Sequence, residues 1–364
     1  MCGQADRNTV ETHPLSRAAE RAYRATSTDS NMRRIAIIGA GSWGTALAIV
    51  AARAGHEVRL WSRNPAVVSS INEQRSNVMY LQGATIPYEV SAREDLVATT
   101  QDCSMAILAA PSHAARELLT RISSALNSKA ILVSAAKGIE IETGQRISQI
   151  AEQVLGTGIT NRFVCLSGPS FAKEVVAGSP TAIVAASNES EAARVVQATL
   201  SFQNLRIYTN SDVVGTELGG SVKNVMAIAA GMTTGMGLGT NSVAALITRG
   251  LAEISRLALH EGAQPETLMG LAGVGDLVLT CTGGLSRNRY VGEELGKGRP
   301  LAEITSGMNE VAEGIKTARA VKRLADNAKL ELPITNEVNA VLYDGKPVRE
   351  AVAELMRRPL REEG

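Results

Sequence analysis

The sequence predicts an α/β domain built on a doubly wound parallel sheet, followed by an all-α domain. Short apolar runs alternate with helical patterns up to about residue 210, which is typical of strands buried on both faces and joined by helices. From residue 211 the strand-like runs stop and helical patterns continue to the end. The chain has 364 residues, enough for two domains with separate cores.

The composition excludes several classes of protein. Hydrophobic residues make up 45% of the chain and charged residues 20%, with a net charge of +1, so a basic surface for nucleic acid or an anionic membrane is not expected. No run of about 18 apolar residues is present, so membrane insertion is not expected. The four cysteines are far apart, which predicts neither a metal site nor disulfides and favours a cytoplasmic location.

Residues 1–31 are polar and lack the apolar segment of a secretory signal. We expect a flexible tail there, a dinucleotide-binding domain over 32–210 and a helical substrate domain over 211–364. Met32 directly precedes the first strand pattern, and the sequence leaves open whether it is the true start.

Residues 33–64, "RRIAIIGAGSWGTALAIVAARAGHEVRLWSRN", predict strand, turn, helix and strand. The first strand covers Ile35 to Ile38, and the helix runs from Ser42 to near Gly55, a natural helix stop. The turn contains G-x-G-x-x-G, formed by Gly39, Gly41 and Gly44. This spacing allows a tight turn, close approach to a pyrophosphate and packing of helix on strand, and predicts a Rossmann-type dinucleotide site.

The end of the second predicted strand bears on the choice of cofactor. An NAD-specific site has an acidic residue there, whereas this chain has Trp61, Ser62 and Arg63. A Ser–Arg pair suits the 2′-phosphate of NADP. The alternative is that Arg63 is simply a surface residue.

Later apolar runs predict five further strands, and the helical part has two clear amphipathic patterns. One helix carries Arg249, Glu253, Arg256 and His260 along one stripe, which favours a solvated face. Another is predicted to end before Pro333. The expected strands cover residues 104–110, 130–136, 163–168, 181–187 and 205–210.

Lys223 is the one charge between the ends of the segment 217–249, which is otherwise made of apolar and small polar residues. One interpretation is a lysine whose aliphatic stem is buried and whose ammonium reaches solvent. The other is a catalytic lysine, because a desolvated ammonium has a lowered pKa and can donate a proton to a carbonyl.

Other polar residues favour the catalytic interpretation. Several follow predicted strands, at the edge where doubly wound sheets bind ligands, and a Ser-Arg-Asn-Arg run offers forked donors for phosphate oxygens. Asp276 could orient a hydroxyl or the lysine. Cys281 has no base near it in sequence, so a small buried residue is favoured over a nucleophile. The candidates are Lys137, Gly168, Pro169, Ser170, Asp276, Ser286, Arg287, Asn288 and Arg289.

These motifs, in this order, resemble the bacterial NAD(P)-dependent glycerol-3-phosphate dehydrogenases. The resemblance runs from about residue 34 to beyond 313. Two positions depart from the usual pattern, with Ala136 where Thr is usual and Ser221 where Ala is common. The matching stretches are "GAGSWGTALA", "APSHA", "AAKGIE", "SGPSFAKE", "ELGGSVKNVMAIAAG", "AALITRGLAE", "MGLAGVGDLVLTCTGGLSRNR" and "VAEG".

The resemblance implies reduction of dihydroxyacetone phosphate to sn-glycerol 3-phosphate with NADP or NAD as cofactor, feeding glycerophospholipid synthesis. It implies that Lys223 is the proton donor and acceptor. The implied substrate contacts are Lys137, Gly168, Ser170, Lys223, Asp276, Ser286, Arg287 and Asn288. The implied cofactor contacts, besides the three glycines, are Ser42, Trp43, Arg63, Asn64, Tyr80, Lys137, Ala172, Arg287, Val311 and Glu313.

Two other functions stay open at this point. A related hydroxyacid dehydrogenase would need a group that binds a carboxylate instead of a phosphate. A nucleotide-sensing protein could keep the fold without the chemistry, although Lys223 and Asp276 are both retained here. The expected partner is a phosphorylated small molecule, and a homodimer is one option for the assembly.

Overall fold

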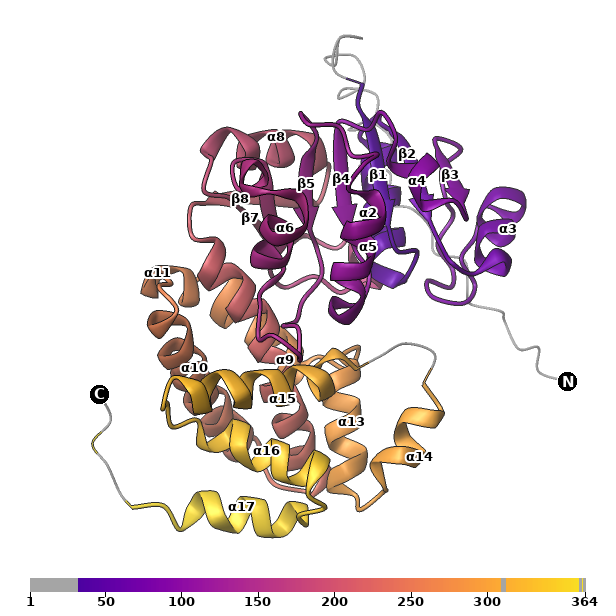
Figure 1. Cartoon of the computed structure of the whole chain (residues 1–364). Coiled ribbons are helices and arrows are strands. Elements are labelled where there is room, and N and C mark those ends of the chain that lie inside the picture. Colours follow the sequence, from indigo (N-terminus) through magenta and orange to yellow (C-terminus); the bar gives the residue numbers. More distant parts are fainter. Residues whose placement is uncertain (1–31, 309–311, 360–361, 363–364) are drawn as a thin grey trace, which may run out of the picture. The chain divides into compact units, whose positions relative to one another are not determined.

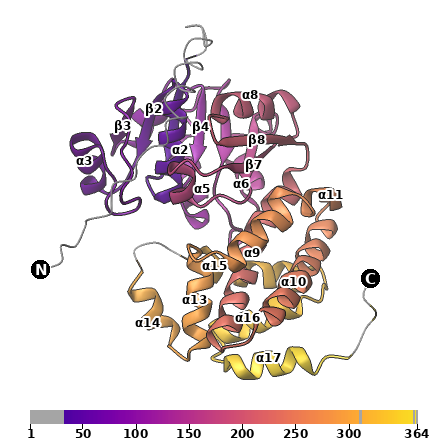
Figure 2. The same cartoon turned by 180° about the vertical axis from the view of Figure 1, so that it is seen from behind.

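The structure is a computed structural model that describes residues 32–308, 312–359 and 362. The described residues from Arg33 onward belong to one compact unit, seen from two sides in Figures 1 and 2. The expected tail, residues 1–31, and the expected cofactor contact Val311 lie outside the described residues. What was expected of them therefore stays a prediction.

Within the described residues, eight strands form one sheet. They are β1 (Arg34–Ile38), β2 (Glu57–Trp61), β3 (Val90–Arg93), β4 (Met105–Leu108), β5 (Ile131–Ser134), β6 (Phe163–Ser167), β7 (Thr181–Ala186) and β8 (Leu205–Asn210). Their order is β3-β2-β1-β4-β5-β6-β7-β8. The first six strands in this order have the arrangement of a dinucleotide-binding sheet, so the predicted fold class is confirmed.

The strand directions correct one part of the prediction. Neighbours from β3 to β6 are parallel, and β7 is parallel to β8. The pair β6–β7 is antiparallel, so the prediction of a parallel sheet is wrong for that pair. The connection 168–180 contains only the short helix α7 (Ala172–Val176). A parallel neighbour needs a crossover, usually a longer helix, that returns the chain to the end of the sheet where the previous strand began.

Burial explains which strands the sequence revealed. Ile35, Ala36, Ile37 and Ile38 are all fully buried in β1, as an unalternating apolar run predicts. The edge strand β3 was not predicted. Its sequence, VSAR, alternates between buried and partly exposed positions and is too short and polar to give a clear pattern.

Helices join the strands of the sheet. The helix α2 begins at Ser42 and ends at Arg53, and Gly55 follows with a positive φ of 92°, which confirms the predicted helix and its stop. The helices of this part are α2 (Ser42–Arg53), α3 (Pro65–Gln74), α4 (Leu96–Thr100), α5 (Ala115–Ile122), α6 (Ile147–Leu155), α7 and α8 (Ser190–Leu200), with short turns η2 (Ser112–Ala114) and η3 (Thr157–Ile159).

After β8 the described chain is helical, drawn from magenta through orange to yellow in Figure 1. The long helix α9 (Val213–Gly235) is buried over almost its whole length, and other helices of this part surround it. These are α10 (Thr240–His260), α11 (Pro265–Leu268), the π-helix η4 (Leu271–Gly275), α12 (Asp276–Thr282), α13 (Arg287–Gly296), α14 (Leu301–Ser306), α15 (Glu313–Asn327), α16 (Pro333–Tyr343) and α17 (Val348–Met356).

Length and apolar character decide whether any of the described helices could cross a membrane. None of them alone combines the length and the apolar character needed to cross a bilayer. One pair, Pro265–Thr282 with Arg287–Gly296, meets the test jointly but is bent by 47°.

The charged stripe on α10 is not wholly solvated, which corrects a second expectation. Arg249, Arg256 and His260 are exposed, but Glu253 is only 4% exposed. Its carboxylate accepts hydrogen bonds from the amides of Ile334 (2.6 Å) and Thr335 (3.1 Å), at the start of α16. A charge pattern along one helix cannot show that a second helix begins against it.

Candidate functional site

The glycine turn lies between β1 and α2 and leaves no room for side chains at Gly39 and Gly44. Gly39 has a φ of +116°, and a Cβ there would lie 2.8 Å from the carbonyl oxygen of Ala109, just after β4. A Cβ on Gly44 would lie 1.9 Å from the carbonyl oxygen of Gly39. Gly41 is the N-cap of α2. The turn therefore lies between β1 and β4, where the strand order reverses and doubly wound sheets bind nucleotides.

The remaining expected cofactor residues of the sheet part are distributed around this turn. Ser42 and Trp43 form the first turn of α2 and are partly buried. Arg63 is exposed after β2, so its position leaves both interpretations of this residue open. Asn64 is the N-cap of α3 and accepts a hydrogen bond from the Ala66 amide at 3.0 Å. Tyr80 is partly buried and packs against the core of the sheet.

Glu313 connects the helical part to the turn after β4. Its carboxylate accepts a hydrogen bond of 2.6 Å from the hydroxyl of Ser112. A Cβ on Gly138 would lie 2.2 Å from the same hydroxyl. Ser112, Gly138 and Glu313, from the motifs "APSHA", "AAKGIE" and "VAEG", thus come together, although the sequence alone did not single out Ser112.

Lys137 follows β5 and bridges two neighbouring segments. Its ammonium donates to the carbonyl oxygen of Gly168 (3.2 Å) and to the carboxylate of Asp276 (2.7 Å). The Ser170 hydroxyl donates to the same Gly168 carbonyl at 3.1 Å. Gly168 has a φ of +135°, and a Cβ would lie 2.9 Å from the Cα of Ile183, so only glycine fits there. Ala172, an expected cofactor contact, begins the next helix, α7.

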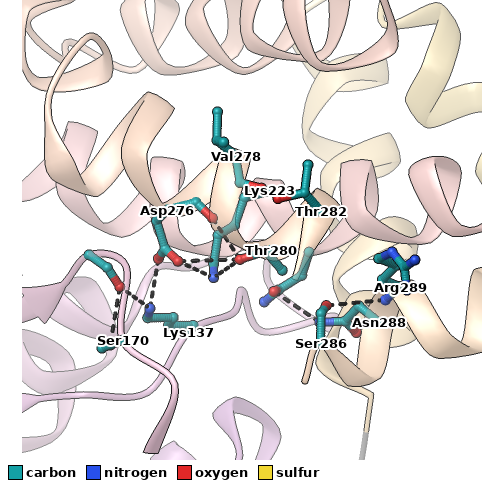
Figure 3. Close-up of polar contacts among 12 residues, drawn as sticks. Lys137, Ser170, Lys223, Asp276, Val278, Thr280, Thr282, Ser286, Asn288 and Arg289 are labelled. Carbon is teal, nitrogen blue, oxygen red and sulfur yellow. Dashed lines mark hydrogen bonds and ion pairs between the residues drawn. The ribbon is translucent and has the colours of Figure 1, made fainter. Parts of the chain in front are cut away.

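Lys223 lies in the middle of α9 and is 6% exposed. Its ammonium donates to the Asp276 carboxylate at 2.5 Å and to the Thr280 hydroxyl at 2.6 Å. Figure 3 shows Lys137 and Lys223 reaching Asp276. The interpretation of Lys223 as a lysine that reaches solvent is therefore wrong, because its charged end is buried and paired.

The shared carboxylate sets the ionisation of both residues. Burial lowers the pKa of Lys223 from 10.5 to about 8; the charge of Asp276 opposes this change and that of Lys137 adds to it. Burial alone would raise the pKa of Asp276, but the charges of Lys137 and Lys223 and their hydrogen bonds hold that pKa below its usual value. The site thus contains an ionised carboxylate beside a lysine that exchanges its proton near neutral pH.

An unusual turn brings Asp276 to the lysines. The π-helix η4 ends at Gly275, directly before Asp276 begins α12. A Cβ on Gly273 would lie 2.0 Å from the carbonyl oxygen of Leu268, so the turn closes only with glycine there. Thr280 lies one turn further along α12 and donates its hydroxyl to the Asp276 carbonyl oxygen at 2.6 Å. π-Helical turns are rare and often occur at functional sites.

The expected phosphate segment lies at the start of α13. Ser286 is the N-cap and accepts a hydrogen bond from the Arg289 amide at 3.2 Å. The buried Asn288 donates to Asn224 on α9 (2.9 Å) and accepts from the Gly314 amide (2.9 Å). Arg287 is exposed.

Arg289 was expected to share phosphate binding with Arg287. Instead its guanidinium pairs with Glu293 at 3.3 Å, one turn further along α13. Arg289 is partly buried whereas Arg287 is exposed, and this difference in exposure favours Arg287 as the donor to a ligand.

Sequence reasoning missed Thr280 and Asn224. Thr280 lies four residues after Asp276, the spacing that places two side chains on one face of a helix, so that signal was available. Asn224 directly follows Lys223, but its partner Asn288 belongs to another helix, and no local pattern reveals such a contact.

Cys281 is buried, and burial raises the pKa of its thiol to about 12. A thiol with so high a pKa is a poor nucleophile, in agreement with a small buried residue. Among the described residues, no group of His, Cys, Asp and Glu is arranged to hold a metal ion.

Comparisons with known proteins agree with this geometry. Residues 34–193 match the family description "NAD-dependent glycerol-3-phosphate dehydrogenase N-terminus", and residues 212–353 match "NAD-dependent glycerol-3-phosphate dehydrogenase C-terminus". Among curated relatives, the glycerol-3-phosphate dehydrogenase (NAD(P)+) of Koribacter versatilis is 52% identical over 330 residues, covering 90% of this chain and 98% of the relative. That of Geobacter sp. strain M21 is 48% identical over 331 residues, covering 91% and 99%.

A solved structure shows the same arrangement. The crystal structure of glycerol-3-phosphate dehydrogenase from Coxiella burnetii is 40% identical, with a TM-score of 0.86 over 90% of this chain and 99% of that one. The similarity therefore extends across both the sheet part and the helical part.

Proposed function

Because the chain belongs to the NAD-dependent glycerol-3-phosphate dehydrogenase family, we propose that it interconverts dihydroxyacetone phosphate and sn-glycerol 3-phosphate with NADP or NAD. The observation that carries this proposal is the buried Lys223–Asp276 pair at the edge of a dinucleotide-binding sheet. It supplies the proton donor that carbonyl reduction needs. The product would enter glycerophospholipid synthesis in the cytoplasm.

The residues around the glycine turn fit a dinucleotide. Side chains at Gly39 and Gly44 would collide with backbone, so the turn stays tight and packed on the sheet. Gly41, at the start of α2, has no side chain that would keep a pyrophosphate away from the main chain. Arg63 lies where a 2′-phosphate would bind, and no acidic residue directly follows β2 to repel that phosphate. The bound nicotinamide supplies or accepts the hydride. The other expected contacts of the dinucleotide are Ser42, Trp43, Asn64, Tyr80, Lys137, Ala172, Arg287, Val311 and Glu313.

The proton is handled by Lys223. In the reducing direction its ammonium stabilises the negative charge that develops on the substrate oxygen and then donates a proton to it. In the reverse direction the neutral amine accepts the hydroxyl proton. Asp276 keeps the ammonium in place, and Thr280 accepts a second hydrogen bond from it.

The substrate would lie between Lys223 and the start of α13. Arg287 offers a guanidinium to the phosphate, and the first amides of a helix favour an anion. Ser286 and Asn288 hold this helix start in place through their own hydrogen bonds. Lys137, Gly168 and Ser170 would border the other side of the substrate.

We also propose two domains, residues 32–210 and 211–364, divided where β8 ends and α9 begins. The site draws on both, because Lys137 and Gly168 come from the first and Lys223 and Asp276 from the second. A homodimer is the assembly we propose to test by light scattering.

The proposed activity is tested by following NADPH oxidation with dihydroxyacetone phosphate. The Lys223→Met variant is the matched control, and we expect it to lower kcat by at least about 100-fold while NADPH still binds. Near wild-type turnover in the folded variant would remove Lys223 from the mechanism. Preferential turnover of a 2-oxo acid by the wild type would instead identify a hydroxyacid dehydrogenase. No turnover of either substrate, with NADPH still bound, would favour a sensor.

A further inference from the structure

Glu217 is a buried carboxylate to which the proposed mechanism assigns no role. It lies on α9 and is 7% exposed. One of its oxygens accepts the Ser148 amide (2.8 Å), and the other accepts the Ser148 hydroxyl (2.6 Å) and the Arg146 guanidinium (2.8 Å). Arg146 and Ser148 lie at the start of α6, beside the sheet. Glu217 therefore joins the long helix of the helical part to a helix of the sheet part.

This contact is close to Lys223 along the same helix. Lys223 lies six positions after Glu217, which corresponds to about 9 Å along a helix axis. Between them, a Cβ on Gly219 would lie 2.6 Å from the Ala272 carbonyl oxygen, and one on Gly220 would lie 2.5 Å from the Ser167 hydroxyl. The helix therefore passes between the end of β6 and η4 without spare room. A displacement of α9 at Glu217 would be transmitted to Lys223.

The loop between β5 and α6 is attached to the helical part at both of its ends. Lys137, near its beginning, bonds to Asp276, and Arg146, at its end, bonds to Glu217. In the middle, Glu140 forms a two-pronged ion pair with Arg116 on α5, with both distances 2.8 Å. The Arg146–Glu217 ion pair and the Lys137–Asp276 ion pair thus connect the two ends of one loop to the helical part.

We infer that Glu217, held by Arg146 and Ser148, is a positioning residue that sets the distance between Lys223 on α9 and the Lys137 loop, and so keeps both lysines on Asp276. The inference rests on the proposed function for its kinetic test. In the sequence "ELGGSVK", Glu217 thus anchors the helix, the two glycines allow close packing and Lys223 carries the chemistry.

A loosened anchor would have a defined electrostatic result. The titratable groups that influence the pKa of Lys223 are Asp276, Lys137 and the Cys281 thiol, and the thiol is neutral because burial raises its pKa to about 12. If Lys137 withdraws, Lys223 keeps its carboxylate but loses a like charge that lowers its pKa. The pKa of Lys223 then rises from about 8 toward its ordinary value. A purely structural role for Glu217 would leave this pKa unchanged.

The test compares Glu217→Gln with Glu253→Gln. Glu253 is an equally buried carboxylate that accepts two amides at the start of a helix, but its contacts lie on α16, away from Asp276. Both variants should melt at a lower temperature. Only Glu217→Gln should lower kcat, by about 10-fold to 100-fold as expected for a displaced catalytic group, and raise the pKa of Lys223. The KM for NADPH should be unchanged.

Three measurements decide the outcome. The first is kcat against pH with dihydroxyacetone phosphate. The second is an NMR titration of 13C-labelled lysine, in which Lys223→Met identifies the signal; it reports the pKa even if the wild type has no dehydrogenase activity. A folded Glu217→Gln variant with wild-type kcat and pKa, or a Glu253→Gln variant with the same changes, would overturn the inference.

The third measurement applies the same two assays to Ser148→Ala, and it decides the outcome if Glu217→Gln does not fold. Ser148→Ala removes one hydrogen bond to Glu217 and leaves the ion pair with Arg146, so this protein should remain folded. Its pKa at Lys223 should move upward by a smaller amount. An unchanged pKa and kcat in Ser148→Ala would also overturn the inference, whereas an inactive wild type with a shifted lysine titration would overturn only the proposed reaction.

Discussion

The ammonium of Lys223 lies 2.5 Å from the carboxylate of Asp276, and both groups are almost completely buried. The second carboxylate oxygen is 2.7 Å from Lys137. One acid therefore serves two lysines, which leaves an excess positive charge in the site. Such a site is suited to a substrate that brings negative charge with it.

The activity should depend on pH through Lys223. Burial lowers its pKa to about 8, and reduction requires the protonated amine. We expect kcat/KM for dihydroxyacetone phosphate to fall as the pH rises through about 8, and kcat/KM for glycerol 3-phosphate oxidation to rise over the same range. Initial rates in both directions, measured from about pH 6 to about pH 10, check this. A flat profile for reduction up to the alkaline limit would contradict the assignment.

Thr280→Val should weaken catalysis without unfolding the protein. The variant has nearly the same shape but cannot accept the hydrogen bond from Lys223. A hydrogen bond to a charged group contributes about 1.5–3 kcal/mol, so kcat should fall by roughly tenfold or more. Loss of this acceptor disfavours the ammonium, so the pKa of Lys223 should fall further, which moves the pH profile in the opposite direction from Glu217→Gln. Thr282→Val, on the exposed side of α12, is the matched control.

Arg287→Ala should weaken substrate binding. The exposed guanidinium at the start of α13 is our candidate donor to the phosphate, so KM for dihydroxyacetone phosphate should rise by at least about tenfold. Turnover of a ketone without phosphate, if measurable, should be unaffected. Arg289→Ala is the control, because Arg289 pairs with Glu293. An unchanged KM in Arg287→Ala would shift the assignment to Lys137.

The cofactor preference should follow the residues after β2. NADPH should be used at least as well as NADH, because Arg63 can pair with a 2′-phosphate and no carboxylate repels it. Replacing Ser62 by Asp and Arg63 by Ala should reverse the preference. Values of kcat/KM for both cofactors in both proteins give the comparison. A wild type that prefers NADH by about tenfold or more would show that the ribose is recognised elsewhere.

The parts of the fold that local chemistry dictates were predictable. The glycine turn follows from a three-glycine pattern, and the structure leaves no room for side chains at Gly39 and Gly44; Lys223 was conspicuous as a lone charge in an apolar segment. The antiparallel pair β6–β7 was not predictable, because the residues of a buried strand do not encode its direction. Glu253 was misjudged for a similar reason, since its partners belong to a helix about 80 residues later in the chain and a stripe of charges has the same pattern whether it faces solvent or another helix.

The π-helix before Asp276 makes the length of this segment a functional quantity. A π-helical turn holds more residues than an α-helical turn. Deleting one residue between Leu271 and Gly275 would let the turn become α-helical and rotate one side of it by about 100° relative to the other. The helices could persist, yet Asp276 would no longer point at Lys223. The number of residues between Leu271 and Gly275 therefore matters for activity in its own right, separately from the identity of their side chains.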